Sequence, residues 1–404
     1  MEQLEPKKGF NVDYRHAGLD GEACKFANYH FGRRFVDKVM DKYVRSVSSA
    51  ESVRGDLLKY HRKYTTSTVR RDKTNLPVLQ SIADDFTSKE KLVPLIGGAI
   101  KHEDFPRDKS CGLPWREKGF KTKGEALADK EVRGSIFRQW EAIGNGREGF
   151  GLPDTCAYFR AQLVAPDENK IRAVWGIPLD VIVEEFRFFN PYIRWLEQTG
   201  APIAYCVEMA TGGMAYINEM CDQFPNHKYL MVEYKEFDKS IPPWLIRDAF
   251  KIVFDSFNLT QVEDVEGKRE RVNPARTKRR IRALVKYFIN TPVRLPSGDR
   301  FLKKGGVPSG SMFTNIINSI VNAIIMRYCI YHTTGHLPAA EMHLGDDSFI
   351  IPEGITNLDD LTYVAKEKFE MDVHPKKSYL TTNPENVQFL DYFNRRGLPY
   401  KGHA

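Results

Sequence analysis

The chain has 404 residues, of which 42% are hydrophobic and 12% aromatic, so it can bury a large core and is not a disordered tail. It contains no run of about 18 apolar residues, and its first residues lack the apolar stretch of a secretory signal. We therefore expect a soluble protein of the cytosol or of a particle interior, with no membrane partner. The chain carries 60 Lys and Arg against 53 Asp and Glu, a net charge of +7, which is compatible with a polyanionic partner such as nucleic acid.

The cysteine pattern argues against a zinc ribbon and against a disulfide framework, because no CxxC pair occurs. We expect reduced, mostly buried thiols at the six positions, Cys24, Cys111, Cys156, Cys206, Cys221 and Cys329.

The first hundred residues mix short helical patterns with basic stretches, and no internal repeat or low-complexity linker divides the chain. One such stretch interleaves Lys59, Arg62 and Arg70 with Tyr60 and Tyr64. A solvated helical face and an RNA-facing surface are equally good interpretations of this pattern.

The pattern sharpens from residue 229. The apolar run 229–232 is typical of a short strand and leads into the acidic segment 233–238. Pro242 and Pro243 then open a predicted helix with apolar residues at helical spacing. The order is strand, acidic loop, helix.

A predicted hairpin over 294–302, turning at 296–299, precedes the glycine-containing loop 305–310. The loop leads into a long predicted helix from about 311 to 331. Thr314, Asn318 and Asn322 form a polar stripe along it, at spacings of four residues. Because an unpartnered polar stripe is costly to bury, we expect it to face a ligand, water or another polar group.

Two apolar segments, 342–344 and 348–351, flank the tight turn Gly345, Asp346 and Asp347. A hairpin of this kind projects both acids from one end of a sheet. A lone Gly-Asp-Asp is more often an ordinary surface turn. Here, however, four features follow one another in the chain: an acidic strand end, a Pro-Ser-Gly loop before a helix with a polar stripe, the acidic hairpin, and lysines after it. This order favours a metal site for phosphoryl transfer, in which hard carboxylate oxygens bind Mg²⁺.

Over roughly residues 110–401 the sequence resembles the right-handed viral RNA-dependent RNA polymerases, specifically those of double-stranded RNA viruses of the partitivirus and picobirnavirus type. The segments that carry the resemblance are 233–238 for motif A, 309–319 for motif B, 345–347 for motif C, 371–377 for motif D, 389–393 for motif E, 170–176 for motif F and 110–115 for motif G. Motifs A, B and C in this order are the specific part of the match.

The resemblance implies roles for individual residues. Glu233, Asp346 and Asp347 would hold two Mg²⁺ or Mn²⁺ ions, and Lys377, or its neighbour Lys376, would protonate the leaving pyrophosphate. The implied substrate-binding and template-binding residues are Asp238, Ser309, Gly310, Thr314 and Asn318 around the ribose 2′-hydroxyl, Lys170, Arg172 and Arg160 on the triphosphate, and Ser110, Gly112 and Pro114 on the template.

Two features depart from the family pattern. The first acid of motif A is an aspartate in the family and is Glu233 here, and the extra methylene moves the carboxylate by more than about 1 Å against a metal geometry that tolerates a few tenths. A displacement of that size can cost roughly a hundredfold in rate. The second departure is that few residues follow motif E, so we expect the helical thumb to be absent or truncated.

The predicted fold is therefore α+β, a right-hand polymerase with an antiparallel palm sheet backed by helices. We expect fingers over 1–222, the first palm part over 223–259, a fingers insertion over 260–305 and the second palm part over 306–404. The predicted activity is viral RNA replication and transcription from ribonucleoside triphosphates on an RNA template. A viral capsid protein is a further candidate partner, and the virion interior or the host cytoplasm is the expected location. The alternatives are a catalytically weakened relative that binds RNA, and a reverse transcriptase.

Overall fold

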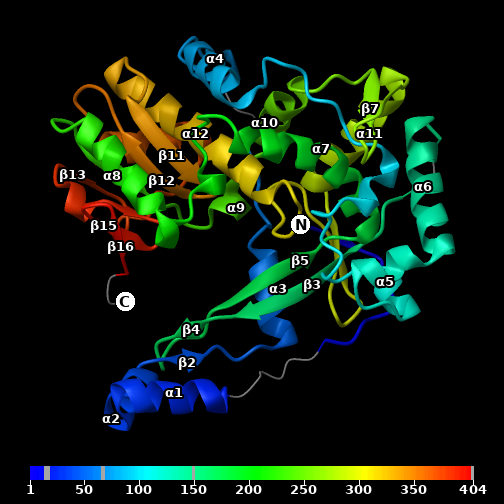
Figure 1. The fold of residues 1–404 in the computed structure, drawn as a ribbon, viewed down its shortest axis with the longest axis horizontal. Helices are drawn as coiled ribbons and strands as arrows, with labels where there is room; N and C mark the ends of the chain where they lie inside the picture. The colour runs from blue at the N-terminus through cyan, green and yellow to red at the C-terminus, as the bar shows by residue number, and fades with distance from the viewer. Residues whose placement is uncertain (13–18, 65–68, 148–150, 402–404) are drawn as a thin grey trace.

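The computed structural model describes residues 1–12, 19–64, 69–147 and 151–401. Within these ranges helices and short strands mix along the whole chain, and two sheets of four and five strands organise them (Figure 1). This agrees with the predicted α+β class.

The four-stranded sheet, here called the central sheet, has the order β11, β12, β6, β13, and every neighbouring pair is antiparallel. Its strands are β11 (Ala340–Leu344), β12 (Asp347–Ile351), β6 (Tyr229–Val232) and β13 (Tyr379–Thr381). The predicted strand 229–232 and the predicted acidic hairpin are both confirmed. All four residues of β6 are buried, as expected for an inner strand of apolar residues.

A long helix, α12 (Thr314–Thr334), packs against the central sheet and is surrounded by α4 (Asn75–Phe86), α10 (Pro243–Asp255) and α13 (Leu358–Phe369). Every residue from Ile316 to Ile330 is buried, because helices or the sheet cover the apolar surface on all sides. The helix begins three residues later than predicted, since residues 311–313 form a turn instead. Gly335, in the left-handed conformation, ends it.

The five-stranded sheet has the order β1, β10, β9, β3, β5. Its strands are β1 (Glu2–Leu4), β10 (Arg300–Leu302), β9 (Pro292–Arg294), β3 (Thr155–Ala161) and β5 (Ile171–Gly176), so the predicted hairpin over 294–302 is confirmed. The β3 and β5 ribbon reaches away from the body of the molecule toward the helix pair α1 (Gly21–Phe31) and α2 (Arg33–Met40) (Figure 1). Beside it run α3 (Ala50–Leu58) and the small pair β2 (Val44–Arg45) and β4 (Leu163–Val164).

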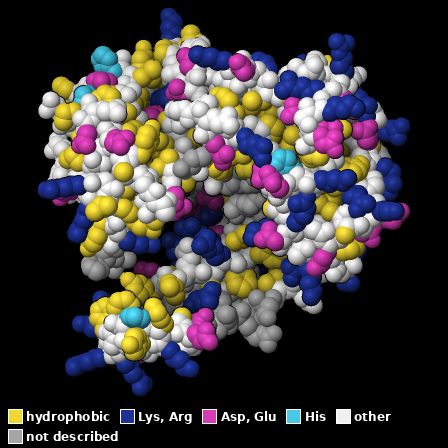
Figure 2. All heavy atoms as spheres, viewed as in Figure 1, with side chains coloured by type: hydrophobic (Ala, Val, Ile, Leu, Met, Phe, Trp, Pro, Cys, Tyr) yellow, Lys and Arg dark blue, Asp and Glu magenta, His cyan; other side chains and the backbone are white. Residues whose placement is uncertain are grey.

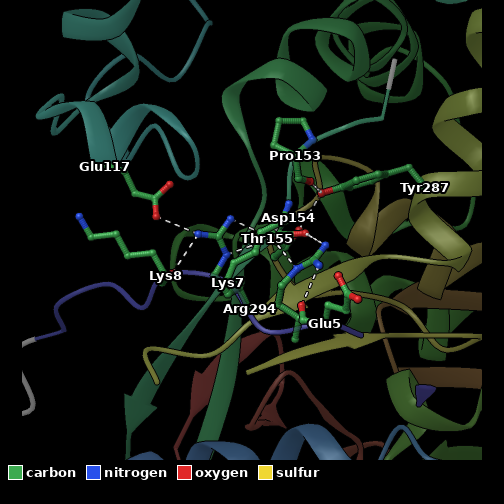
Figure 3. A network of polar contacts seen from close by, with 10 residues as sticks. Glu5, Lys7, Lys8, Glu117, Pro153, Asp154, Thr155, Tyr287 and Arg294 are labelled. Atoms are coloured by element: carbon green, nitrogen blue, oxygen red, sulfur yellow. Dashed lines mark hydrogen bonds and ion pairs between the residues drawn. The ribbon is translucent and has the colours of Figure 1, made fainter. Parts of the chain in front are cut away.

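A buried ion-pair network holds the N-terminal residues on the five-stranded sheet (Figure 3). The Asp154 carboxylate, 4% exposed, accepts hydrogen bonds from Arg294 Nε at 3.0 Å and Arg300 Nε at 2.9 Å. Arg294 also donates to Glu117 Oε1 at 2.8 Å and to the carbonyl of Lys8 at 3.1 Å. Because each buried charge has several partners, the network offsets its own desolvation cost and fixes the path of the N-terminal chain.

The other helices and strands pack around these two sheets. They are α5 (Lys123–Ala128), α6 (Lys130–Gly144), α7 (Leu179–Glu197), α8 (Gly213–Gln223), α9 (Phe237–Ser240), β7 (Gln261–Glu263), β8 (Arg269–Arg271), α11 (Pro274–Ile289), β14 (Gln388–Phe389), β15 (Tyr392–Arg395) and β16 (Leu398–Tyr400). Of these, α7 is largely buried. None of the helices in the described part of the chain is both long and apolar enough to span a bilayer.

The described cysteine thiols are free. Cys111, Cys156, Cys221 and Cys329 are buried and Cys24 is half-buried, which agrees with the expectation of mostly buried thiols at these positions. The side chain of Cys206 lies outside the described residues.

Candidate active site

The acids singled out in the sequence meet at one end of the central sheet. Glu233 directly follows β6, and Asp346 and Asp347 form the turn into β12. Since β12 runs antiparallel to β6 with Ser348 opposite Val232, the next positions outward are Asp347 and Glu233. A recess of about 500 Å³ opens there, lined among others by Glu233, Asp347, Lys377 and Asp391.

The electrostatics of this recess are those of a crowded acidic site. Burial, reinforced by the charges of Asp346, Glu233 and Asp391, raises the pKa of Asp347 to about 7, and Lys377 opposes this effect. The pKa of Asp346 is also raised, first by its enclosure in protein and then by the neighbouring acids, while Arg172 opposes the shift. A divalent cation would relieve this mutual repulsion.

Lys377 neutralises the glutamate of the site. Its Nζ lies 2.6 Å from Glu233 Oε1, and the pair is half-exposed. The backbone around Glu233 is fixed as well, because its N–H donates to Ser378 Oγ at 3.0 Å and its carbonyl accepts from the His374 N–H at 2.7 Å. The segment predicted as motif D therefore lies directly against the end of β6.

The donor set fits a hard divalent ion in its chemistry, since it consists of carboxylates, and burial together with neighbouring acids raises the pKa of Asp346 and of Asp347. The side chains are not preassembled as ligands. Across the described ranges, no three Asp, Glu, His or Cys side chains converge in an arrangement that could hold a metal ion. In this arrangement Glu233 Oε1 is bound to Lys377.

Helix α12 holds the acidic turn in place. The Gly345 N–H donates to Ser319 Oγ at 2.9 Å, and the Gly345 carbonyl accepts from Asn322 Nδ2 at 3.1 Å. Asn322 Oδ1 in turn accepts from the Tyr234 hydroxyl at 3.2 Å. The polar stripe predicted on this helix thus faces another polar group at Asn322, and that group is the backbone of the Gly-Asp-Asp turn.

One turn earlier on the same helix, Asn318 is 7% exposed and its Oδ1 has no hydrogen-bond partner within the described part of the chain. Buried amide oxygens are normally paired, so Asn318 Oδ1 keeps the capacity to accept a hydrogen bond.

Asp238 and the motif B residues lie around the same loop. Asp238, in α9, accepts at its carbonyl the N–H of Val307 at 2.7 Å, and Ser309 Oγ accepts the N–H of Trp175 at 3.3 Å. Thr314 Oγ1 donates to the Pro308 carbonyl at 2.7 Å. No hydrogen bond joins the four predicted ribose-binding side chains to one another in the described chain, and Asp238, Ser309 and Thr314 are held by other partners.

Two glycines of the predicted substrate and template segments are required by the packing. Gly310 has a φ of 101°, and a Cβ there would lie 2.2 Å from the Trp175 carbonyl oxygen. Gly112 has a φ of 66° and lies against Ile177 and Pro178, just after β5. The template-binding residues predicted beside it, Ser110 and Pro114, are therefore anchored next to the end of the β3 and β5 ribbon.

The basic residues predicted to bind the triphosphate lie on that ribbon. Arg160 on β3 is directly opposite Arg172 on β5, and Lys170 immediately precedes β5. All three are exposed, and none makes an ion pair with a described residue. Like charges directly opposite each other are unfavourable, so the arrangement favours an anion between them.

The segment after α3 takes part in the site in a way that sequence reasoning missed. Lys59 lies 3.3 Å from Glu236, and Arg62 donates to Ser240 at 2.6 Å and lies 3.4 Å from Glu236. The backbone of Glu236 has a φ of 51°, in the left-handed region, which is strained for this residue. The contacts with Lys59 and Arg62 help to offset the cost of this conformation. Lys59 and Arg62 thus attach the N-terminal chain to α9, and Lys59 remains exposed to solvent.

A hollow is visible near the centre of one face, with acidic and basic side chains gathered around it (Figure 2). In the matching ribbon view α9 lies next to this position, between the β15 and β16 hairpin and β5 (Figure 1).

An acidic turn therefore lies at the end of the antiparallel central sheet, within electrostatic reach of Arg172 on the basic ribbon. The chain belongs to the family described as "Viral RNA-dependent RNA polymerase", whose model matches residues 25–399.

Several relatives carry the name RNA-directed RNA polymerase. The protein of Cryptosporidium parvum virus 1 is 29% identical over 306 residues, covering 72% of this chain and 52% of the relative. That of White clover cryptic virus 1 is 23% identical over 255 residues, covering 58% of this chain and 41% of the relative. The chain thus spans about half the length of the curated relatives it matches.

A solved structure, the RNA-dependent RNA polymerase of a human picobirnavirus, matches with a TM-score of 0.66 at 15% identity. The match covers 98% of this chain and 72% of that one. At this identity the likeness concerns the fold alone. It confirms the predicted right-hand architecture of a mixed α+β protein.

Proposed function

We propose that this chain catalyses template-directed addition of ribonucleoside triphosphates to an RNA 3′-hydroxyl, with release of pyrophosphate. The observation that carries the proposal is the convergence of Glu233 with Asp346 and Asp347 at one end of the central sheet. Family membership and the names of the relatives support it.

Two Mg²⁺ or Mn²⁺ ions are the proposed cofactors, held by Glu233, Asp346 and Asp347. When bound, they would neutralise the charge that develops on the attacking and leaving oxygens. Lys377, or its neighbour Lys376, is the proposed proton donor to pyrophosphate, since Lys377 already lies at the rim of the acidic recess.

The basic ribbon provides the proposed binding site for the triphosphate. Arg172, on the ribbon, is close enough to Asp346 to oppose the rise in the pKa of that carboxyl. Arg160 on β3 and Lys170, immediately before β5, add charge to the same ribbon. Guanidinium groups bind phosphate oxygens in pairs, so the ribbon would orient the triphosphate toward the acidic turn.

Ribose recognition is assigned to Asp238, Ser309, Thr314 and Asn318, with Gly310 allowing the close approach of the loop to β5. The orphaned Asn318 Oδ1 supports this assignment, because a bound ribose hydroxyl would supply its missing donor. Ser110, Gly112 and Pro114 are the proposed template contacts.

The domain layout follows from these roles. We assign fingers to 1–222 and 260–305, which include the five-stranded sheet and the basic ribbon, and the palm to 223–259 and 306–404, which include the central sheet. The proposed partners are the RNA template, the product duplex and ribonucleoside triphosphates, with a viral capsid protein as a further candidate. The proposed location is the virion interior or the host cytoplasm.

A second candidate is a weakened relative that binds RNA without efficient synthesis. The specific observations in its favour are that Glu233 is paired with Lys377 and that, among the described residues, the acids do not form a ready group of metal ligands. A reverse transcriptase is the third possibility, and the polar side chains provided for a 2′-hydroxyl disfavour it.

Primer extension on a homopolymeric RNA separates these candidates. The unmodified chain should incorporate ribonucleotides with Mg²⁺ or Mn²⁺, and Asp346→Ala should abolish incorporation. Asp372→Ala is the matched control, because this exposed acid pairs with Lys366 at 2.7 Å outside the recess.

Glu233→Asp reports on the glutamate itself. A sharp gain in incorporation would show that the longer side chain weakens the enzyme, and equal inertness of every variant would refute polymerase activity of this chain. Preference for deoxynucleotides would establish the reverse transcriptase.

A further inference from the structure

Tyr60 is a buried residue that directly contacts the proposed ribose-binding aspartate. It follows α3, is 2% exposed, and its hydroxyl donates to Asp238 Oδ2 at 2.8 Å. The carbonyl of Val307 lies 3.0 Å from the same hydroxyl. A hydroxyl has one hydrogen, and the anionic carboxylate is the stronger acceptor. Burial and the charge of Asp238 raise the pKa of Tyr60, so it stays a donor.

The backbone of Asp238 is held by the loop before α12. Its carbonyl accepts the N–H of Val307 at 2.7 Å, and the Gly306 N–H donates to the Ile241 carbonyl at 2.9 Å. A Cβ at Gly306 would lie 2.8 Å from both the Asp238 carbonyl oxygen and the Tyr60 ring. Tyr60, α9 and this loop therefore pack without room for a side chain between them.

A buried lysine fixes the loop from its other side. Lys303 is fully buried, and its Nζ donates to the carbonyls of Gly306 at 2.5 Å and Phe288 at 2.7 Å. The loop is thus tied to the end of α11, and the Tyr60 hydroxyl meets a rigid partner.

The two oxygens of the Asp238 carboxylate have different surroundings in this arrangement. Oδ2 is occupied by Tyr60, and Oδ1 accepts no hydrogen bond from any described residue, so it is open to a donor such as a ribose hydroxyl. The Tyr60 ring is itself held edge-on to Trp175 at 5.1 Å, and the Trp175 N–H donates to Ser309. One tyrosine therefore connects both sides of the proposed ribose site.

We propose that Tyr60 is a positioning residue that fixes the Asp238 carboxylate for discrimination of ribose from deoxyribose. The inference rests on the proposed function and deepens it. Without the hydroxyl, the carboxylate keeps its charge but loses the bond that selects one rotamer, so it would meet the 2′-hydroxyl less often in the right orientation.

The test compares Tyr60→Phe with Tyr64→Phe in single-nucleotide primer extension. Tyr64 is the matched control, because its ring packs on Gly305 of the same loop while its hydroxyl donates to the Lys239 carbonyl at 2.9 Å and not to Asp238. Values of kcat and KM are measured for ATP and dATP. Thermal melting verifies that both variants fold.

Tyr60→Phe should lower kcat/KM for ATP by about tenfold, mainly through KM, and leave kcat/KM for dATP unchanged, because one charge-assisted hydrogen bond is removed. Tyr64→Phe should preserve the ATP to dATP ratio. Asp238→Ala should lower the ratio too, and adding Tyr60→Phe to it should have no further effect.

An equal loss for ATP and dATP in Tyr60→Phe would indicate a purely structural role and overturn the inference, as would an unchanged ratio. If the unmodified chain incorporates neither nucleotide, the proposed function itself fails. If it incorporates ATP and only the Tyr60 prediction fails, the polymerase assignment stands.

Discussion

Two asparagines one turn apart on α12 provide a sharp test of how this site is built. Asn322 is fully buried and satisfies both the Gly345 carbonyl and the Tyr234 hydroxyl. Asn318 is nearly as buried, yet its Oδ1 has no partner in the described chain. We therefore expect Asn322→Ala to lower the stability of the fold, and Asn318→Ala to lower substrate use in a protein of normal stability.

Asn322→Ala leaves two buried polar groups unsatisfied. Each costs about 1–3 kcal/mol, so the free energy of unfolding should fall by roughly 2–6 kcal/mol, a large part of the roughly 5–15 kcal/mol that typical folds possess. Asn318→Ala removes an oxygen that has no hydrogen-bond partner in the described chain. The gain from removing this unpaired polar atom offsets the lost packing, so the free energy of unfolding should change by no more than about 1 kcal/mol.

Urea unfolding followed by tryptophan fluorescence measures both effects, and primer extension adds the functional comparison. Asn318→Ala should lower kcat/KM for ATP about tenfold in a protein of normal stability, because the ribose loses an acceptor. Equal destabilisation by the two substitutions would refute the reasoning. It would mean that the hydrogen bonds of the asparagine side chain do not determine how much free energy of unfolding is lost when it is removed.

Three further predictions concern charged groups. Asp347→Asn should abolish nucleotide incorporation, and Mg²⁺ should raise the Tm of the unmodified chain but not of this variant, because binding to the folded state alone stabilises it. Burial raises the pKa of Glu185 from 4.5 to about 7, so the folded chain binds more protons than the unfolded chain between these values, and stability should fall by up to about 3 kcal/mol as pH rises from 4.5 through 7. Glu185→Gln should flatten this part of a Tm against pH curve, and identical curves would contradict the assignment. Asp154→Asn should cost about 3–5 kcal/mol, because Arg294 and Arg300 lose their buried carboxylate, and amide exchange of β1 should accelerate while the acidic recess keeps its Mg²⁺ response.

The sequence by itself determined the local elements of the site. The strand 229–232, the hairpin over 294–302 and the acidic turn at 345–347 are all present, because side-chain periodicity and turn chemistry act between residues close in the chain. The order of these elements also led to the family that the family model then showed. The start of α12 was placed three residues early, since residue preferences do not distinguish a turn from the first turn of a helix.

Only the tertiary structure decided which distant side chains meet. Lys377 reaches Glu233 across 144 residues, and Tyr60 reaches Asp238 across 178. Asn322, for which the sequence left ligand, water or another polar group open, binds the Gly345 carbonyl, and Ser319 accepts the Gly345 N–H. These contacts depend on how sheets and helices pack against each other in three dimensions, and local residue patterns carry no information on that packing.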